Sequence, residues 1–184
     1  MKQQSGSKYD EFIARLEKQL QSKHCEIWRN PQISATLEPA LLATRIEWNI
    51  VRIPVHLVVD YVGRPSKDDL VKLFEEGLKF SKLVYSAGEG VPVWLSSFAM
   101  IPCIACEDLD PEIISYVNQQ HLLWHQAINF WDHGYIYFPV LYSLKTNEIH
   151  YWKGFSILGG GVHPLARKFV EENIVAVAKS YSTV

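Results

Sequence analysis

Residues 44 to 62 alternate apolar and polar side chains with a period of two, and this pattern limits the possible folds more than any other feature. Such alternation is typical of a β-strand with one buried face. From Val51 onward the apolar side chains move to the odd positions. We therefore expect a bulge or a tight turn near Ile50. Pro54 cannot donate a hydrogen bond to a neighbouring strand, which indicates a sheet edge or a bulge at that position.

A helix and another strand follow this extended segment. Residues 66 to 85 place apolar side chains on one helical face, and Ser66 and Asp69 have the spacing of a capping box. After two glycines, residues 91 to 106 form a nearly unbroken apolar stretch, which is typical of a strand buried on both faces. If the two strands are parallel neighbours, the order strand, helix, strand implies a right-handed crossover.

The remaining elements are expected from the same periodicities. Residues 135 to 144 and 148 to 152 indicate a hairpin around residues 145 to 147. Apolar side chains with the helical period predict three more helices, over residues 8 to 23, 110 to 132 with a possible break near Asn118, and 164 to 179. The expected fold class is therefore α+β, with a mixed β-sheet and about four helices packed against it.

Length and composition favour one domain. The 184 residues fit one hydrophobic core, and 48% of them are hydrophobic, which is ordinary for a folded protein. We find no internal repeat and no linker after residue 7. We expect a disordered tail over residues 1 to 7 and a single α+β domain over residues 8 to 184.

The charge balance disfavours some classes of partner. Lys and Arg number 18 against 20 Asp and Glu, giving a net charge of -2 without a basic stripe. We therefore expect no binding to nucleic acid. The polar start lacks the apolar core of a secretory signal, and no apolar run approaches the roughly 20 residues that span a bilayer. These features, with only three cysteines, predict a cytoplasmic protein without membrane attachment.

His121 and His125 are the candidate metal ligands. Residues four apart on a helix face the same way and can bind one metal ion together. No Glu follows His121, so the general base of an H-E-x-x-H metalloprotease is missing. Asp132 would lie roughly 16 Å further along a continuous helix, too far to share the ion. Because two ligands make an incomplete zinc site, histidines packed in the core are the competing interpretation.

Cys103 and Cys106 have the C-x-x-C spacing of redox motifs and zinc knuckles. Residues three apart on a strand point to opposite faces, so the two sulfur atoms are expected to diverge. The pair also ends an apolar strand instead of beginning a helix, which is where the thiol pKa is lowered. We therefore expect both thiols to be buried and inert.

A run of glycines precedes the last helix and predicts a possible anion site. The loop from Gly159 includes Gly160 and Gly161 and leads through His163 to Arg167 in the first helical turns. Backbone N–H groups at such a helix start can bind phosphate or carboxylate. The loop matches neither G-x-G-x-x-G nor G-x-x-x-x-G-K-[ST], so an ordinary turn is the competing interpretation.

Arg52, His56 and Asp60 occupy the even positions of the strand that follows Val51. Residues four apart on a strand are about 13 Å apart, so these side chains cannot hydrogen-bond directly to one another. The expectation is a solvated strand face with no catalytic role.

Three functions remain open. The leading hypothesis is a non-enzymatic binding or interaction domain without a cofactor that self-associates as a homo-oligomer, because aromatic residues are abundant and no catalytic set is assembled. The second is a metal-dependent hydrolase or nuclease that adds acidic residues such as Glu107 or Asp108 to His121 and His125. The third is a small-anion or nucleotide-like ligand binder at residues 159 to 167.

Overall fold

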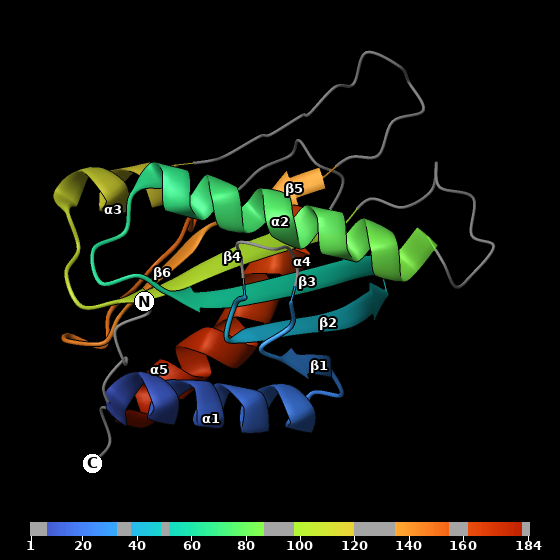
Figure 1. The fold of residues 1–184 in the computed structure, drawn as a ribbon, viewed down its shortest axis with the longest axis horizontal. Coiled ribbons are helices and arrows are strands. Elements are labelled where there is room, and N and C mark those ends of the chain that lie inside the picture. Colours follow the sequence, from blue (N-terminus) through green and yellow to red (C-terminus); the bar gives the residue numbers. More distant parts are fainter. Residues whose placement is uncertain are drawn as a thin grey trace.

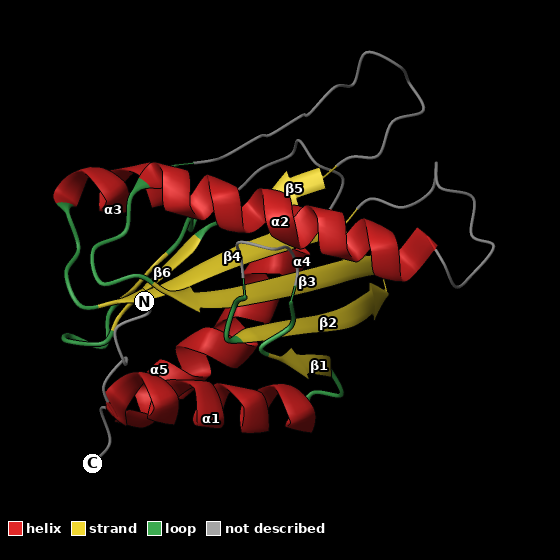
Figure 2. Ribbon diagram, in the orientation of Figure 1, coloured by secondary structure: helices red, strands yellow, loops and turns green. Residues whose placement is uncertain are grey.

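The computed structural model describes residues 7–32, 38–48, 52–86, 98–119, 135–154 and 162–181. Its strands are β1 (Glu26–Arg29), β2 (Leu41–Trp48), β3 (Arg52–Tyr61), β4 (Phe98–Cys106), β5 (Tyr135–Tyr137), β6 (Val140–Ser143) and β7 (Ile149–His150). Its helices are α1 (Ser7–Ser22), α2 (Lys67–Ser86), α3 (Pro111–Val117), α4 (Val162–Val170) and α5 (Ala176–Tyr181), the last two joined by the π-helical turn η2 (Glu171–Val175). Figure 2 shows how these helices and strands are distributed.

The strands form one mixed sheet in the order β1-β2-β3-β4-β6-β7 (Figure 1). β1, β2 and β3 pair antiparallel, β3, β4 and β6 pair parallel, and β7 returns antiparallel to β6. β5 pairs parallel with the first part of β4, at Phe98 to Met100, and β6 pairs with the later part, from Cys103 onward. The expected α+β class with a mixed sheet is therefore confirmed.

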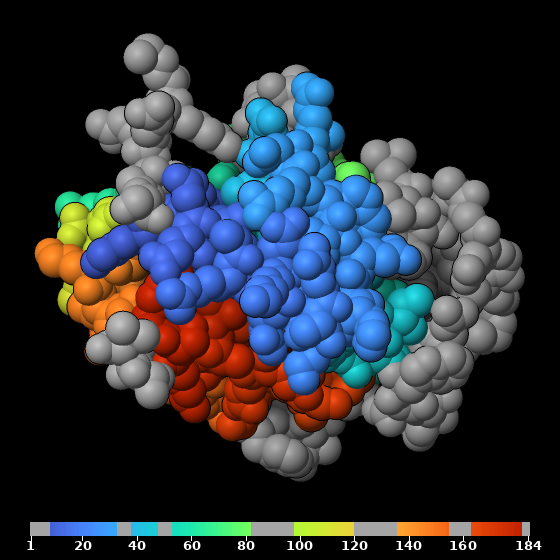
Figure 3. Space-filling model, turned by 90° about the horizontal axis from the view of Figure 1, so that it is seen from below, coloured from blue at the N-terminus to red at the C-terminus, as the bar shows by residue number. Residues whose placement is uncertain are grey.

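Helices cover both faces of the sheet. The odd positions of β3, from Ile53 to Val59, pack with α1, α4, η2 and α5 in one core. The even position Val58 packs with α2 and α3 in a second core on the opposite face. Figure 3 shows α1 and the C-terminal helices side by side on the first face. Arg15 of α1 donates to Ser180 Oγ (3.2 Å) and lies over the ring of Tyr181, which ties the two helices together.

Several sequence expectations hold. α2 begins one residue after Ser66, whose backbone N–H donates to the Asp69 carboxylate (2.8 Å) while its hydroxyl oxygen accepts from the backbone N–H of Asp69 (3.3 Å), the two reciprocal bonds of a capping box. Pro54 is paired with Ile46 of β2, whereas pairing with β4 begins only at Val55. The proline therefore sits where the described part of β3 has one neighbouring strand, in agreement with a local edge.

Other expectations become more specific. The extended segment from residue 44 is two strands, because Trp48 of β2 pairs with Arg52 of β3 in antiparallel register, which agrees with the expected alternative of a tight turn near Ile50. The helix that begins at Pro111 ends at Val117 and is capped by Asn118, in agreement with the possible break near that residue, and residues 120–132 of the expected helix lie outside the described part of the chain. The short strand β1 was not expected, since four residues are too few to show a clear period. Residues 49–51 and 120–134 lie outside the described residues.

Candidate functional site

The start of α4 meets the segment that follows β7. This segment, residues 151–154, lies along the first turns of α4 through contacts made by Trp152 and Lys153. A helix begins with backbone N–H groups that have no partner inside the helix, so its start is suited to bind a negative charge. We call the arrangement of Trp152, Lys153, His163 and Arg167 the α4 site. Gly160 and Gly161, which the sequence placed in the same site, lie outside the described residues.

His163 is the most unusual residue of the α4 site. It is 3% exposed, and neither ring nitrogen has a hydrogen-bond partner among the described residues. Its ring instead lies between aromatic rings, with its centroid 5.2 Å from that of Trp152 and 6.2 Å from that of Phe138. Burial lowers the pKa of His163, so the ring is neutral at pH 7. A buried imidazole with no partner is costly, because its donor and its acceptor both lose their hydrogen bonds to water.

The indole of Trp152 is held against the neighbouring backbone. A Cβ atom on Gly154 would lie 2.6 Å from two atoms of this indole, so only glycine allows the observed approach. The edge-to-face contact with His163 further restricts the indole. The Trp152 indole therefore has a fixed position beside the His163 ring, and segment 151–154 lines one side of that ring.

Two positively charged side chains, Arg167 and Lys153, lie beside segment 151–154. Arg167 donates from Nη1 to the carbonyl oxygen of Lys153 (2.8 Å) and from Nε to Glu171 Oε1 (2.8 Å). Glu171 also accepts a bond from the Tyr151 hydroxyl (3.4 Å). Lys153 lies over the Tyr151 ring and forms no ion pair with any residue of the described ranges. Two positive charges and one negative charge therefore surround the helix start, which leaves it electropositive.

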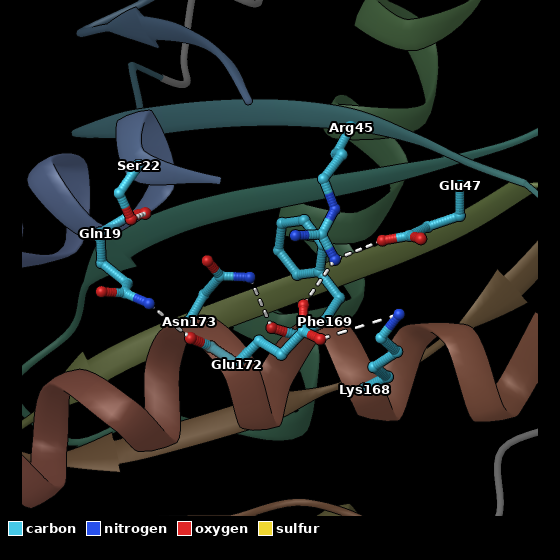
Figure 4. Close-up of polar contacts among 8 residues, drawn as sticks. All are labelled: Gln19, Ser22, Arg45, Glu47, Lys168, Phe169, Glu172 and Asn173. Atoms are coloured by element: carbon cyan, nitrogen blue, oxygen red, sulfur yellow. Dashed lines mark hydrogen bonds and ion pairs between the residues drawn. The ribbon is translucent and has the colours of Figure 1, made fainter. Parts of the chain in front are cut away.

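A second polar cluster lies two turns further along the same helix (Figure 4). Arg45 of β2 pairs with both Glu47 and Glu172, and its guanidinium lies 4.9 Å from the centre of the Phe169 ring. Lys168 pairs with Glu172 at 3.7 Å. We call these four charged residues the Arg45 cluster. Its two positive and two negative charges cancel, so the cluster has no net charge with which to attract an ion. Its ion pairs instead hold the C-terminal helix against β2.

The helix widens where it meets the Arg45 cluster. Asn173 is fully buried in η2 and donates from its side-chain amide to the Phe169 carbonyl oxygen (2.8 Å), as Figure 4 shows. Gln19 of α1 donates to the backbone carbonyl of Glu172 (2.8 Å). Local widening of a helix is often found where side chains donate hydrogen bonds to its backbone carbonyl oxygens. Both bonds are accounted for by helix packing.

His56 lies on a buried face of the sheet, so the expected solvated face is wrong at this position. It is 2% exposed, because α2 covers the even positions of β3. Its Nδ1 lies 2.9 Å from Thr44 Oγ1, and its ring meets that of Phe98 edge to face. Burial lowers the pKa of His56 to about 3. Unlike His163, it has a hydrogen-bond partner and is a satisfied core residue.

The two cysteines behave as the sequence predicts. Cys103 packs in the core under α1 and α4, whereas Cys106 packs in the core under α2. Burial raises the pKa of both thiols, that of Cys106 to about 12, so neither is a thiolate at neutral pH. The two sulfur atoms therefore serve packing on opposite faces of β4.

The expected metal ligands cannot be placed. His121 and His125 lie outside the described residues. Within the described ranges, no three His, Cys, Asp or Glu side chains come together in a way that could hold a metal ion. The described helices also include none that is both long and apolar enough to cross a bilayer.

Sequence reasoning found part of the α4 site and missed the rest. It identified His163 and Arg167 from their place at a helix start, and the structure keeps both at that position. It missed Trp152 and Lys153, which reach the site through the fold of the hairpin. The short distance in sequence from the end of the hairpin to the helix start was the available signal.

Comparison with known proteins gives no further assignment. No protein-family model matches the chain, and neither the curated proteins nor the solved structures gave a match.

Proposed function

We propose that this chain is a non-enzymatic binding domain that takes up a small anion at the α4 site. One observation carries the proposal: the imidazole of His163 is 3% exposed, and both of its nitrogens lack a hydrogen-bond partner in the part of the chain that the structure describes. A carboxylate, sulfate or phosphate oxygen would supply the missing partner. The backbone N–H groups of the first turn of α4 and the charge of Lys153 would share the negative charge, and Arg167 would add its charge at longer range, because its guanidinium stays bonded to Glu171 and to the Lys153 carbonyl.

The Arg45 cluster does not compete with the α4 site for this function. Arg45 and Glu47 each have 13% of the side chain exposed, and their charges are already paired. An incoming anion would have to displace Glu47 or Glu172 from Arg45. At the α4 site, His163 has no hydrogen bond to a described residue that an anion would have to displace.

Calorimetric titration with sodium sulfate at pH 7 tests the proposal. We expect saturable binding to the unaltered chain and its loss in His163→Phe, which keeps a ring of similar shape and removes both nitrogens. Arg167→Gln should weaken binding several-fold, because it removes one cation. Lys18→Gln, on the exposed face of α1, makes the same change in charge away from the site and should leave binding unchanged.

Thermal unfolding provides a second measurement. Sulfate stabilises any folded protein because it is excluded from protein surfaces, so a rise in Tm alone proves nothing. Specific binding adds a further term that grows with the logarithm of ligand concentration. The unaltered chain should therefore gain more in Tm than His163→Phe at equal sulfate. Equal gains, together with no heat of binding, would contradict the proposal.

A further inference from the structure

None of the residues that the structure describes is a close electrostatic partner of His163. The segment 151–154 contributes Tyr151 and Lys153, of which the tyrosine hydroxyl is bonded to Glu171 and the lysine lies over the tyrosine ring. Arg167, on α4 itself, is occupied by Glu171 and by the Lys153 carbonyl. None of these groups shifts the pKa of His163 noticeably, since its one resolved cause is burial.

Within the described residues, β3 and β4 add no charge beneath the start of α4, and the charges of Arg45 and Glu47 on β2 belong to the Arg45 cluster further along the helix. On the face that α4 covers, β3 and β4 present apolar side chains and the Cys103 thiol, whose pKa is raised by burial. The side of the ring toward the β5–β6 connection is occupied by Phe138. The imidazole is therefore neutral because of its dry surroundings, and a single negative charge placed beside it would reverse that balance.

We propose that the α4 site binds its anion together with one proton, which His163 takes up from solvent, so that affinity increases as the pH falls. This inference rests on the proposed function. In the free protein the neutral ring has one N–H donor and one acceptor nitrogen. When an anion enters, protonation turns the ring into a double donor that forms a charge-assisted hydrogen bond to the anion.

Sulfate is a suitable probe because it keeps its charge between pH 6 and 8, whereas phosphate takes up a proton in this range. For binding linked to one proton, the affinity for sulfate should increase by up to about tenfold for each pH unit as the pH falls from 8 to 6. Calorimetry in two buffers with different heats of ionisation should show the uptake of close to one proton for each sulfate bound.

His163→Gln is the matched variant. Its amide keeps one donor and one acceptor but does not titrate, so it should bind sulfate with an affinity that does not depend on pH and without proton uptake. Should this variant fail to fold, the proton count of the unaltered chain decides the question alone.

The outcomes separate the two proposals. Sulfate that fails to bind at every pH overturns anion binding and the proton linkage together. Sulfate that binds to the unaltered chain with constant affinity and without proton uptake leaves the anion site standing and overturns the linkage. If the affinity of His163→Gln for sulfate still changes tenfold for each pH unit, the linkage to His163 is also overturned, because another group then takes up the proton.

Discussion

At the scale of single residues, two histidines that the structure describes as buried, His56 and His163, are in different states. His56 is bonded to Thr44, whereas no described residue bonds either nitrogen of His163. Natural proteins seldom leave a buried polar group unsatisfied unless that group has a function, because stability is lost. Tyr9 and Asn173 also leave one buried atom each without a bond, but His163 leaves both ring nitrogens, and this contrast with His56 favours a binding role.

This argument predicts the effect of His163→Phe on stability. Replacing an unsatisfied polar ring by an apolar ring of similar shape removes an uncompensated cost. In the absence of sulfate we expect the free energy of unfolding to stay the same or rise by up to about 1 kcal/mol. Urea unfolding at pH 7 measures it. A loss of several kcal/mol would show that His163 stabilises the fold, which contradicts the binding argument.

His56 predicts a loss of stability in acid. Its pKa is about 3 in the folded chain, against about 6.5 for an unperturbed histidine. Between these values the unfolded chain binds one more proton than the folded chain, so the free energy of unfolding falls as the pH falls. The slope contributed by His56 is up to about 1.4 kcal/mol per pH unit. The lowered pKa of His163 adds to the loss just below pH 6.5.

Comparison with His56→Gln isolates this contribution, since the carboxyl groups titrate equally in both chains. Urea unfolding at pH 7, 6 and 5 should show a shallower pH dependence for the variant, even where the variant is less stable at pH 7. Parallel dependences in the two chains would mean that His56 is not a neutral core residue.

At the scale of elements, the packing of α2 depends on one glycine. A Cβ atom on Gly77 would lie 2.8 Å from Val58 Cγ2 and 3.1 Å from Met100 Sδ, so the helix lies directly against β3 and β4 there. Val58 is branched at Cβ and lies on a strand inside the sheet, so it cannot move aside easily.

Gly77→Ala should therefore destabilise the chain. Alanine favours a helix over glycine by about 1 kcal/mol, whereas overpacking a core costs about 1–3 kcal/mol. We expect a net loss of about 1 kcal/mol in urea unfolding, although the substitution improves helix propensity. Gly63→Ala is the control, because its Cβ would meet the Tyr61 hydroxyl at 3.8 Å, an ordinary contact. A gain in stability in Gly77→Ala would contradict the close approach.

The elements also show what a sequence reveals about this fold. Long periodic segments such as α2 and β4 were predicted with their faces, and Cys103 and Cys106 were placed on opposite sides of a strand. The burial of His56 was not foreseen, because alternation shows that a face is polar and does not show that a helix covers it. The sequence pointed to His163 and Arg167 because a helix start can be recognised in it. It did not show that the fold brings Trp152 next to that helix start.

At the scale of the whole molecule, self-association stays a prediction of the sequence. It rested on abundant aromatic residues, and all aromatic side chains whose burial the structure describes are buried or half-buried. A sheet edge is the remaining candidate. Asn30 donates to the Ala40 carbonyl (3.1 Å), so by antiparallel alternation the backbone N–H groups of Ile27 and Arg29 point away from β2.

We expect a second copy, where it associates, to pair with β1 across a two-fold axis. Such pairing uses the same edge in both copies, and β7 at the other edge has only two residues, so assembly should stop at a dimer. Ile27→Pro removes an outward N–H group at an edge, where proline is tolerated, and should give a monomer. Ile27→Val keeps that group and should remain a dimer. Light scattering over a concentration series measures the molar mass of each chain. If the unaltered chain stays monomeric throughout, the prediction of self-association is wrong.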